Sequence, residues 1–127
     1  MGSSILLGFY KIGWGIYMNH IIINIATDYT KTPGGRHINE GAYSGEDFRK
    51  RILKPKFLEA LEKNVELFVD LDGGYGYATS FLEEAFGGLA RDMKDRRVLQ
   101  IKIISEEEPS LINKIKSYME DVLDERK

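Results

Sequence analysis

Short apolar runs alternate along this chain with longer segments in which apolar residues recur at helical spacing. The runs at 21–25 and 65–71 are short and rich in β-branched or large apolar residues, which favours buried strands over helices. A further strand is predicted at 98–104, before a strongly acidic segment. Strand and helix signals that alternate in this way are typical of an α/β domain.

The first helix is predicted from Ser44, whose hydroxyl can cap a helix and is followed three residues later by the acid Asp47. Apolar residues then continue at helical spacing to Leu61. Pro55 cannot donate to the helical ladder, so the helix is expected to kink near Lys54 or to restart there with the proline in its first turn.

A second helix is predicted from Ser80, in a capping box with Glu83, and a third after Pro109. Their apolar stripes are Leu82, Ala85, Phe86 and Leu89 in the second helix and Leu111, Ile115, Met119 and Val122 in the third. Glu83 and Glu84 are expected to face outward. Gly87-Gly88 is expected to end the second helix early or to let a neighbouring backbone come close.

Turn chemistry precedes the first helix. Thr32-Pro33-Gly34-Gly35 predicts a turn after which residues 36–38 return as a short antiparallel partner of the first strand. The order is then hairpin, helix, strand, helix, strand, helix. Strands joined by crossover helices pair in parallel, so the expected fold is a small mixed β-sheet, opened by a hairpin, with three helices packed on it.

Residues 1–17 differ from the rest of the chain because they are apolar and interrupted by glycine. They fall short of the roughly 20 apolar residues of a membrane helix and lack the features of a secretory signal. The domain is predicted to span 18–127. The preceding segment is interpreted as a cloning remnant, an extension from an upstream start or an extra edge segment.

Composition narrows the classes of function. The 127 residues carry 18 Lys and Arg against 20 Asp and Glu, which leaves no basic field to attract nucleic acid. The absence of cysteine excludes thiol catalysis and thiolate metal sites, and fits a cytoplasmic setting. No cofactor motif is present, and neither a membrane nor a nucleic acid is expected as a partner.

The stretch 69–88 reads as a strand, an acidic glycine-rich loop and a helix start, the place where α/β folds commonly carry their working surface. In one interpretation Asp70 and Asp72 hold a metal, because Asp70-Leu71-Asp72-Gly73 resembles the nucleophile loop of haloacid-dehalogenase-type phosphatases. The alternative function is thus a small Mg-dependent phosphotransfer enzyme or a nucleotide-binding module. Gly74 stands where that loop has Thr, and no later acidic pair completes a metal site.

A second cluster lies near the first helix start. Arg36 and Arg49 could bind an anion, with Ser44 adding backbone donors from the helix start and Tyr43 beside them. In the structural alternative, Arg36 pairs an acid at the sheet edge and Tyr43 buries its ring.

Several blocks, in order, are similar to STAS-like domains of unknown function, relatives of the anti-sigma-factor antagonists. They are Pro33-Gly34-Gly35-Arg36, Gly41-Ala42-Tyr43-Ser44-Gly45-Glu46-Asp47-Phe48-Arg49, Asp70-Leu71-Asp72-Gly73 and Ser80-Phe81-Leu82-Glu83-Glu84-Ala85-Phe86-Gly87-Gly88-Leu89. The resemblance runs from about residue 18 to about residue 123. It implies a non-enzymatic regulatory or protein-interaction domain of bacterial-type signalling.

In the better-understood antagonists an Asp-Ser-Ser-Gly motif opens the helix after the central strand, and its first serine is phosphorylated by a kinase that is also an anti-sigma factor. The motif falls on Ala78-Thr79-Ser80-Phe81, so the resemblance makes Thr79 and Ser80 the phosphoacceptor candidates. It implies a histidine-kinase-like ATPase as partner. The candidate partner surface comprises Asp72, Tyr75, Glu83 and Glu84. In the structural alternative, Thr79 and Ser80 only cap the helix.

Overall fold

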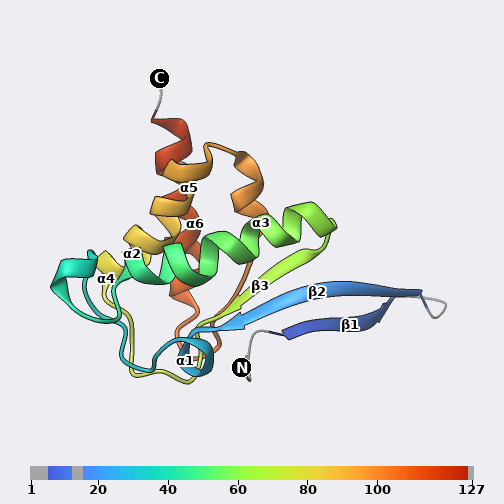
Figure 1. Ribbon diagram of the computed structural model, residues 1–127, viewed down its shortest axis with the longest axis horizontal. Coiled ribbons are helices and arrows are strands. Elements are labelled where there is room, and N and C mark those ends of the chain that lie inside the picture. Colours follow the sequence, from blue (N-terminus) through green and yellow to red (C-terminus); the bar gives the residue numbers. More distant parts are fainter. Residues whose placement is uncertain (1–5, 13–15, 126–127) are drawn as a thin grey trace.

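A computed structural model describes residues 6–12 and 16–125 of the chain. Its sheet has four strands in the order β1-β2-β3-β4, with β1 (Leu6–Ile12) antiparallel to β2 (Ile16–Asn24). β3 (Glu66–Asp70) and β4 (Lys102–Ile104) continue the sheet in parallel with β2. The long helices cover one face of this sheet (Figure 1). The fold is therefore mixed α/β, as predicted.

Two long helical runs supply most of that layer. The first joins α2 (Gly45–Phe48), a π-helical segment η2 (Arg49–Leu53) and α3 (Lys54–Lys63). The second joins α4 (Thr79–Leu82), a π-helical segment η3 (Glu83–Gly87) and α5 (Gly88–Met93). α6 (Ser110–Asp124) completes the layer. The short elements are α1 (Ile25–Asp28) and the 3₁₀ turns η1 (Ile38–Glu40) and η4 (Arg96–Gln100).

Alternation along the strands explains why one face is covered. Ile23 and Val69 are fully buried against the helices, whereas their neighbours Ile22 and Phe68 point to the opposite face and are half-buried. The core on the helical side joins these strands to Phe48, Phe57, Phe81, Phe86 and Ile115. Burial of large apolar side chains from every layer is the main stabilising contribution.

The prediction that residues 36–38 pair with the first strand in a hairpin is wrong. β2 pairs with β1, and Arg36 is not in a strand. The backbone N–H of Glu46 donates to the Arg36 carbonyl at 3.0 Å, and that of Gly45 donates to the Gly35 carbonyl at 3.1 Å. The turn segment is therefore hydrogen-bonded to the start of α2. These bonds use the carbonyls of Gly35 and Arg36, which pairing as a strand would need. The predicted domain boundary between residues 17 and 18 falls inside β2.

Some of the helix predictions are confirmed and others are wrong. α3 begins at Lys54 with Pro55 in its first turn, as predicted from the missing proline donor. The second helix does not end at Gly87-Gly88 but continues as α5 to Met93. The predicted strand at 98–104 is reduced to β4, because η4 occupies residues 96–100. The helix after Pro109 is observed as α6.

Candidate functional site

The loop between β3 and α4 lies at the carboxyl edge of the parallel strands, beside the loop that follows α1. The backbone N–H of Tyr75 donates to the Lys31 carbonyl at 2.9 Å, which joins the two loops. The Tyr75 side chain is 81% exposed at this end of the molecule. Thr79 is exposed and Ser80 half-buried in the first turn of α4, directly after the loop. Tyr75 of the predicted partner surface and the two phosphoacceptor candidates therefore lie close together along the chain, whereas Asp72 and Glu83 are half-buried.

Ser80 does not cap its helix, so this prediction is wrong. The N-cap residue of α4 is Ala78, which has an extended backbone and no side-chain bond to the helix. The helix begins one residue before Ser80, and Ser80 therefore lies within the first turn instead of in front of it. Neither Thr79 nor Ser80 makes a side-chain hydrogen bond with a residue in the described ranges. Their hydroxyls are not used to satisfy the helix end.

Asp72 holds two loops together. Its two carboxylate oxygens each accept a backbone N–H at 3.0 Å, one from Glu106 and one from Glu107. Asp70 accepts the N–H of Asp72 at 2.9 Å, which closes the turn after β3. Within the described ranges, no group of three or more His, Asp or Glu residues is arranged to hold a metal ion. The observed role of both carboxylates is thus to order the loops at the carboxyl edge.

Tyr77 supports the same loop from inside. Its hydroxyl donates to the Leu71 carbonyl at 2.8 Å, and its ring packs near Phe81 with centroids 6.1 Å apart. Burial raises the pKa of the Tyr77 hydroxyl, and the charges of Asp70 and Asp72 add to that shift. The phenol therefore stays protonated and acts as a donor at neutral pH.

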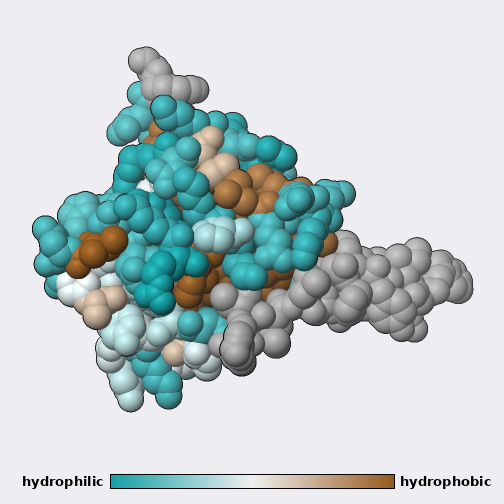
Figure 2. Space-filling model, in the orientation of Figure 1, coloured by the Kyte–Doolittle hydropathy of each residue, from teal (hydrophilic) through white to brown (hydrophobic). Residues whose placement is uncertain are grey.

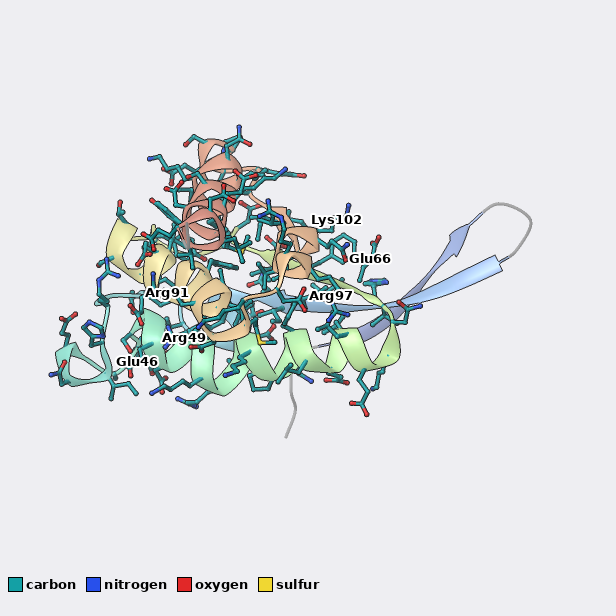
Figure 3. The ribbon with its side chains drawn as sticks, turned by 90° about the horizontal axis from the view of Figure 1, so that it is seen from above. Glu46, Arg49, Glu66, Arg91, Arg97 and Lys102 are labelled. Atoms are coloured by element: carbon teal, nitrogen blue, oxygen red, sulfur yellow. The ribbon has the colours of Figure 1, made fainter. Side chains whose placement is uncertain are left out.

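Arg49 and Glu84 form an ion pair between the two long helical runs. Arg49 is only 7% exposed, and its Nη1 donates to the Glu84 carboxylate at 2.8 Å and to the Glu84 carbonyl at 2.6 Å. Its Nε donates to Asp92 at 3.1 Å. Figure 3 shows Arg49 between the helices. Nη1 and Nε of the guanidinium are thus bound to the chain's own acceptors.

The expectation that Glu84 faces outward is wrong, because Glu84 is only 8% exposed. Residues 84–90 are all buried, so every side of the run is covered here, because both the first helical run and α6 pack against η3. Gly88 leaves room for the charge that pairs with Glu84: a Cβ there would overlap the Arg49 Nη1 and lie 2.9 Å from its Cζ. A side chain, and not a backbone as predicted, approaches the glycine pair.

Arg36 joins this cluster from the loop. Its Nη1 lies 2.5 Å from Glu83 and 3.3 Å from Glu84, and Arg91 binds the other oxygen of Glu83 at 2.8 Å. The hydrogen bond from Arg91, with a further one from Arg36, lowers the pKa of the Glu83 carboxyl. Arg36 thus pairs with acids of a helix and not, as one alternative had it, with an acid of the sheet edge.

The other residues predicted for an anion site have structural contacts. Ser44 is buried, and its hydroxyl accepts the Asp47 N–H at 3.0 Å, which confirms the predicted cap of the first helix. Tyr43 is 45% exposed and packs its ring edge-on against Tyr29. Arg36 and Arg49 do lie close together, but both pair with the carboxylate of Glu84. The sequence signal for this cluster was the presence of Arg36 and Arg49 near the start of the first helix.

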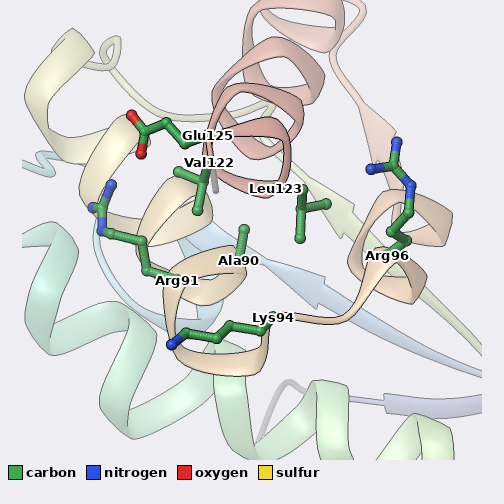
Figure 4. A pocket seen from close by; sticks show the side chains of 7 residues that line it. All are labelled: Ala90, Arg91, Lys94, Arg96, Val122, Leu123 and Glu125. Atoms are coloured by element: carbon green, nitrogen blue, oxygen red, sulfur yellow. The ribbon is translucent and has the colours of Figure 1, made fainter. Parts of the chain in front are cut away.

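A cavity of about 590 Å³ lies elsewhere, between α5, α6 and the start of η4 (Figure 4). Its centre is apolar, formed by Ala90, Val122 and Leu123. Of the cations at its rim, Arg91 binds Glu83 and Arg96 binds Asp124. The close-up shows the Arg96 guanidinium turned away from the apolar centre. The surface drawn in Figure 2 is mostly hydrophilic, with separate hydrophobic areas.

Comparison with known families identifies the class of domain. The family model for the STAS-like domain of unknown function (DUF4325) matches residues 44–111, more than half of the chain. The chain therefore belongs to this family. Searches of curated proteins and of solved structures each returned no significant match. No helix within the described ranges is long and apolar enough to cross a membrane.

Proposed function

We propose that this chain is a non-enzymatic regulatory domain of the cytoplasm, which binds a protein partner through the α4 surface. This surface consists of Tyr75, Thr79, Ser80 and Glu83. The observation that carries the proposal is that the hydroxyls of Thr79 and Ser80 are not used to cap the helix. Thr79 is exposed in the first turn of a helical run of this family, and neither Thr79 nor Ser80 is used in capping.

Phosphorylation at this turn would change the electrostatics of the α4 surface. Thr79 lies four residues before Glu83, and Ser80 three residues before it, so these side chains share one side of the helical run. A phosphate carries a charge of about −2 at neutral pH and would compete with Glu83 for Arg36. By family analogy the partner is a histidine-kinase-like ATPase that supplies the phosphate.

The test requires such an ATPase, which is to be sought among the proteins encoded beside the gene for this chain. Wild type, Thr79→Glu and Ser80→Asp are compared for affinity, with Ser117→Asp on α6 as the matched control, because Ser117 is exposed and distant in sequence. Added charge at residue 79 or 80 should weaken binding about tenfold or more, while the control binds as wild type does. Undiminished affinity of both variants, at unchanged thermal stability, contradicts regulation through this surface.

A second measurement addresses the absence of enzymatic activity that we propose. The carboxylates Asp70 and Asp72 support it, because their hydrogen bonds account for them structurally. Pure wild type should not hydrolyse a phosphomonoester in the presence of magnesium. Turnover by wild type that is lost in Asp70→Asn would overturn the regulatory proposal in favour of a phosphotransfer enzyme.

A further inference from the structure

β4 is the last strand of the sheet, so among the described residues one of its edges has no neighbouring strand. The Leu71 N–H donates to the Ile104 carbonyl at 2.8 Å, which shows that Ile104 turns its backbone groups toward β3. Backbone groups of successive residues point to opposite edges of a parallel strand. Ile103 therefore turns its N–H and C=O to the free edge. Among residues 6–12 and 16–125, none hydrogen-bonds to them.

A hollow of about 280 Å³ runs beside this edge, between β4 and α6. Its apolar lining includes the half-buried Ile103 and the buried Met119. Ile112 borders the same hollow and is 36% exposed, one of the few large apolar side chains left open on the described surface. An apolar side chain of a partner could cover Ile112 here, which removes apolar area from water.

The charged residues of the hollow are all basic. Lys102 comes from β4 and Lys116 from α6, both are exposed, and no acidic residue lines the hollow. Neither lysine forms an ion pair with a residue in the part of the chain that the structure describes. Lys50, Lys54, Lys56 and Lys63 in the first helical run all do so. Figure 3 shows Lys102 apart from Arg49 and Arg91.

We propose that the β4 edge binds an extended acidic segment of a partner protein, which adds to the sheet as a further strand. Its backbone pairs with Ile103, an apolar side chain covers Ile112, and its acids face Lys102 and Lys116. Strand addition of this kind draws affinity from main-chain hydrogen bonds and specificity from alternate side chains. A short edge strand with lysine discourages indiscriminate pairing, which leaves acidic strands as the favoured partners.

The inference is independent of the α4 surface, and its test uses a synthetic probe. The probe is a fluorescein-labelled peptide, Asp-Ile-Glu-Val-Asp-Ile with blocked ends, and binding to the full chain is followed by fluorescence anisotropy. Lys102→Glu combined with Lys116→Glu should weaken binding about tenfold or more. The matched control, Lys31→Glu combined with Lys114→Glu, replaces two exposed lysines outside the hollow and should bind as wild type does.

Amide hydrogen exchange measures the backbone part of the proposal. The Ile103 N–H should exchange rapidly in the free protein and slow about tenfold or more when the peptide is saturating. Ile103→Pro removes this donor and leaves the ladder to β3 intact, because proline is tolerated where an edge N–H faces solvent. This variant should keep the thermal transition of wild type but no longer bind the peptide.

Three results would overturn the inference. One is equal affinity for a peptide in which Lys replaces the acids. Another is binding without protection of the Ile103 amide, which means that the peptide contacts side chains only. The third is a dimer in light scattering in which this amide is already protected, which makes the occupant a second copy of the chain.

Discussion

Glu84 and Thr79 lie five residues apart in one helical run and have opposite surroundings. Glu84 is buried and bonded to a buried guanidinium, whereas Thr79 is exposed and makes no side-chain bond within the described ranges. Both positions carry a polar side chain that a sequence motif could assign to function. A buried polar side chain such as that of Glu84 is held by its partners in the fold, whereas the exposed turn at Thr79 is accessible to a second molecule.

Removal of Arg49 should have the largest effect. Arg49→Met removes the buried cation that lies 2.8 Å from Glu84 and leaves that carboxylate only the longer contacts to Arg36 and Arg91. It should lower the free energy of unfolding by about 3–5 kcal/mol, measured by urea denaturation. Arg91→Met breaks a pair that is 44% exposed at its arginine and should cost under about 1 kcal/mol. Equal losses for the two variants would contradict the contrast between buried and exposed charge.

Gly88→Ala should come next. Alanine normally stabilises a helix relative to glycine, but here the Cβ displaces the Arg49 guanidinium, and overpacking of this kind costs about 1–3 kcal/mol. Gly34→Ala is the control, because a Cβ at Gly34 has no neighbour within 4 Å. In an Arg49→Ala background, Gly88→Ala should become neutral or stabilising. A cost that persists there would mean that Arg49 is not the obstacle.

Asp72→Ala should destabilise by about 2 kcal/mol, because two backbone donors lose a charged acceptor. Hydrogen exchange should accelerate at the amides of Glu106 and Glu107 and leave α3 unchanged. Asp121→Ala, at an exposed position of α6, is the control for loss of a carboxylate. Unchanged exchange at the two amides would show that Asp72 does not join the loops.

Acid should weaken the protein through Glu46 and Glu83. The backbone N–H of Ile38 and the ammonium of Lys50 lower the pKa of Glu46 from 4.5 to about 2, and Arg91 lowers that of Glu83. Carboxyls with a lower pKa in the folded state stabilise it above their unfolded pKa and lose this contribution as the pH falls. The urea midpoint should therefore drop between pH 4.5 and about 2. Glu46→Gln combined with Glu83→Gln should flatten the drop, whereas Asp121→Asn should not.

The smallest effect is expected at Ser80. Because its hydroxyl makes no capping bond, Ser80→Ala should change the free energy of unfolding by less than about 0.5 kcal/mol. Ala78→Ser supplies the missing cap and should stabilise by about 1 kcal/mol, measured in the same urea titrations. If Ser80→Ala instead lowers the free energy of unfolding by about 1 kcal/mol, Ser80 does act as a helix cap.

The elements that sequence predicted well depend on local chemistry. The cap at Ser44, the restart at Pro55 and the stripe of α6 each follow from neighbouring residues. The partner strand of β2 did not follow in this way, because it depends on competition between distant segments for the same backbone groups.

The same division applies to the candidate site. Tyr75 and Thr79 were candidates for the partner surface and for phosphorylation, and both are exposed. The burial of Glu84 could not be predicted, since it depends on helices distant in sequence, the first helical run and α6, that pack against η3. The unused edge of β4 was also hidden in the sequence, because strand order is a tertiary property.

The fit of Arg49 over Gly88 has a consequence for how the sequence can change. A lineage that acquires a side chain at 88 while it retains arginine at 49 passes through an intermediate in which the new Cβ overlaps the guanidinium, and the opposite order passes through one in which Glu84 has lost that guanidinium. The effect of either change thus depends on the residue at the other position. Residues 49 and 88 should therefore vary together among relatives of this chain, and arginine at the first should rarely occur without glycine at the second.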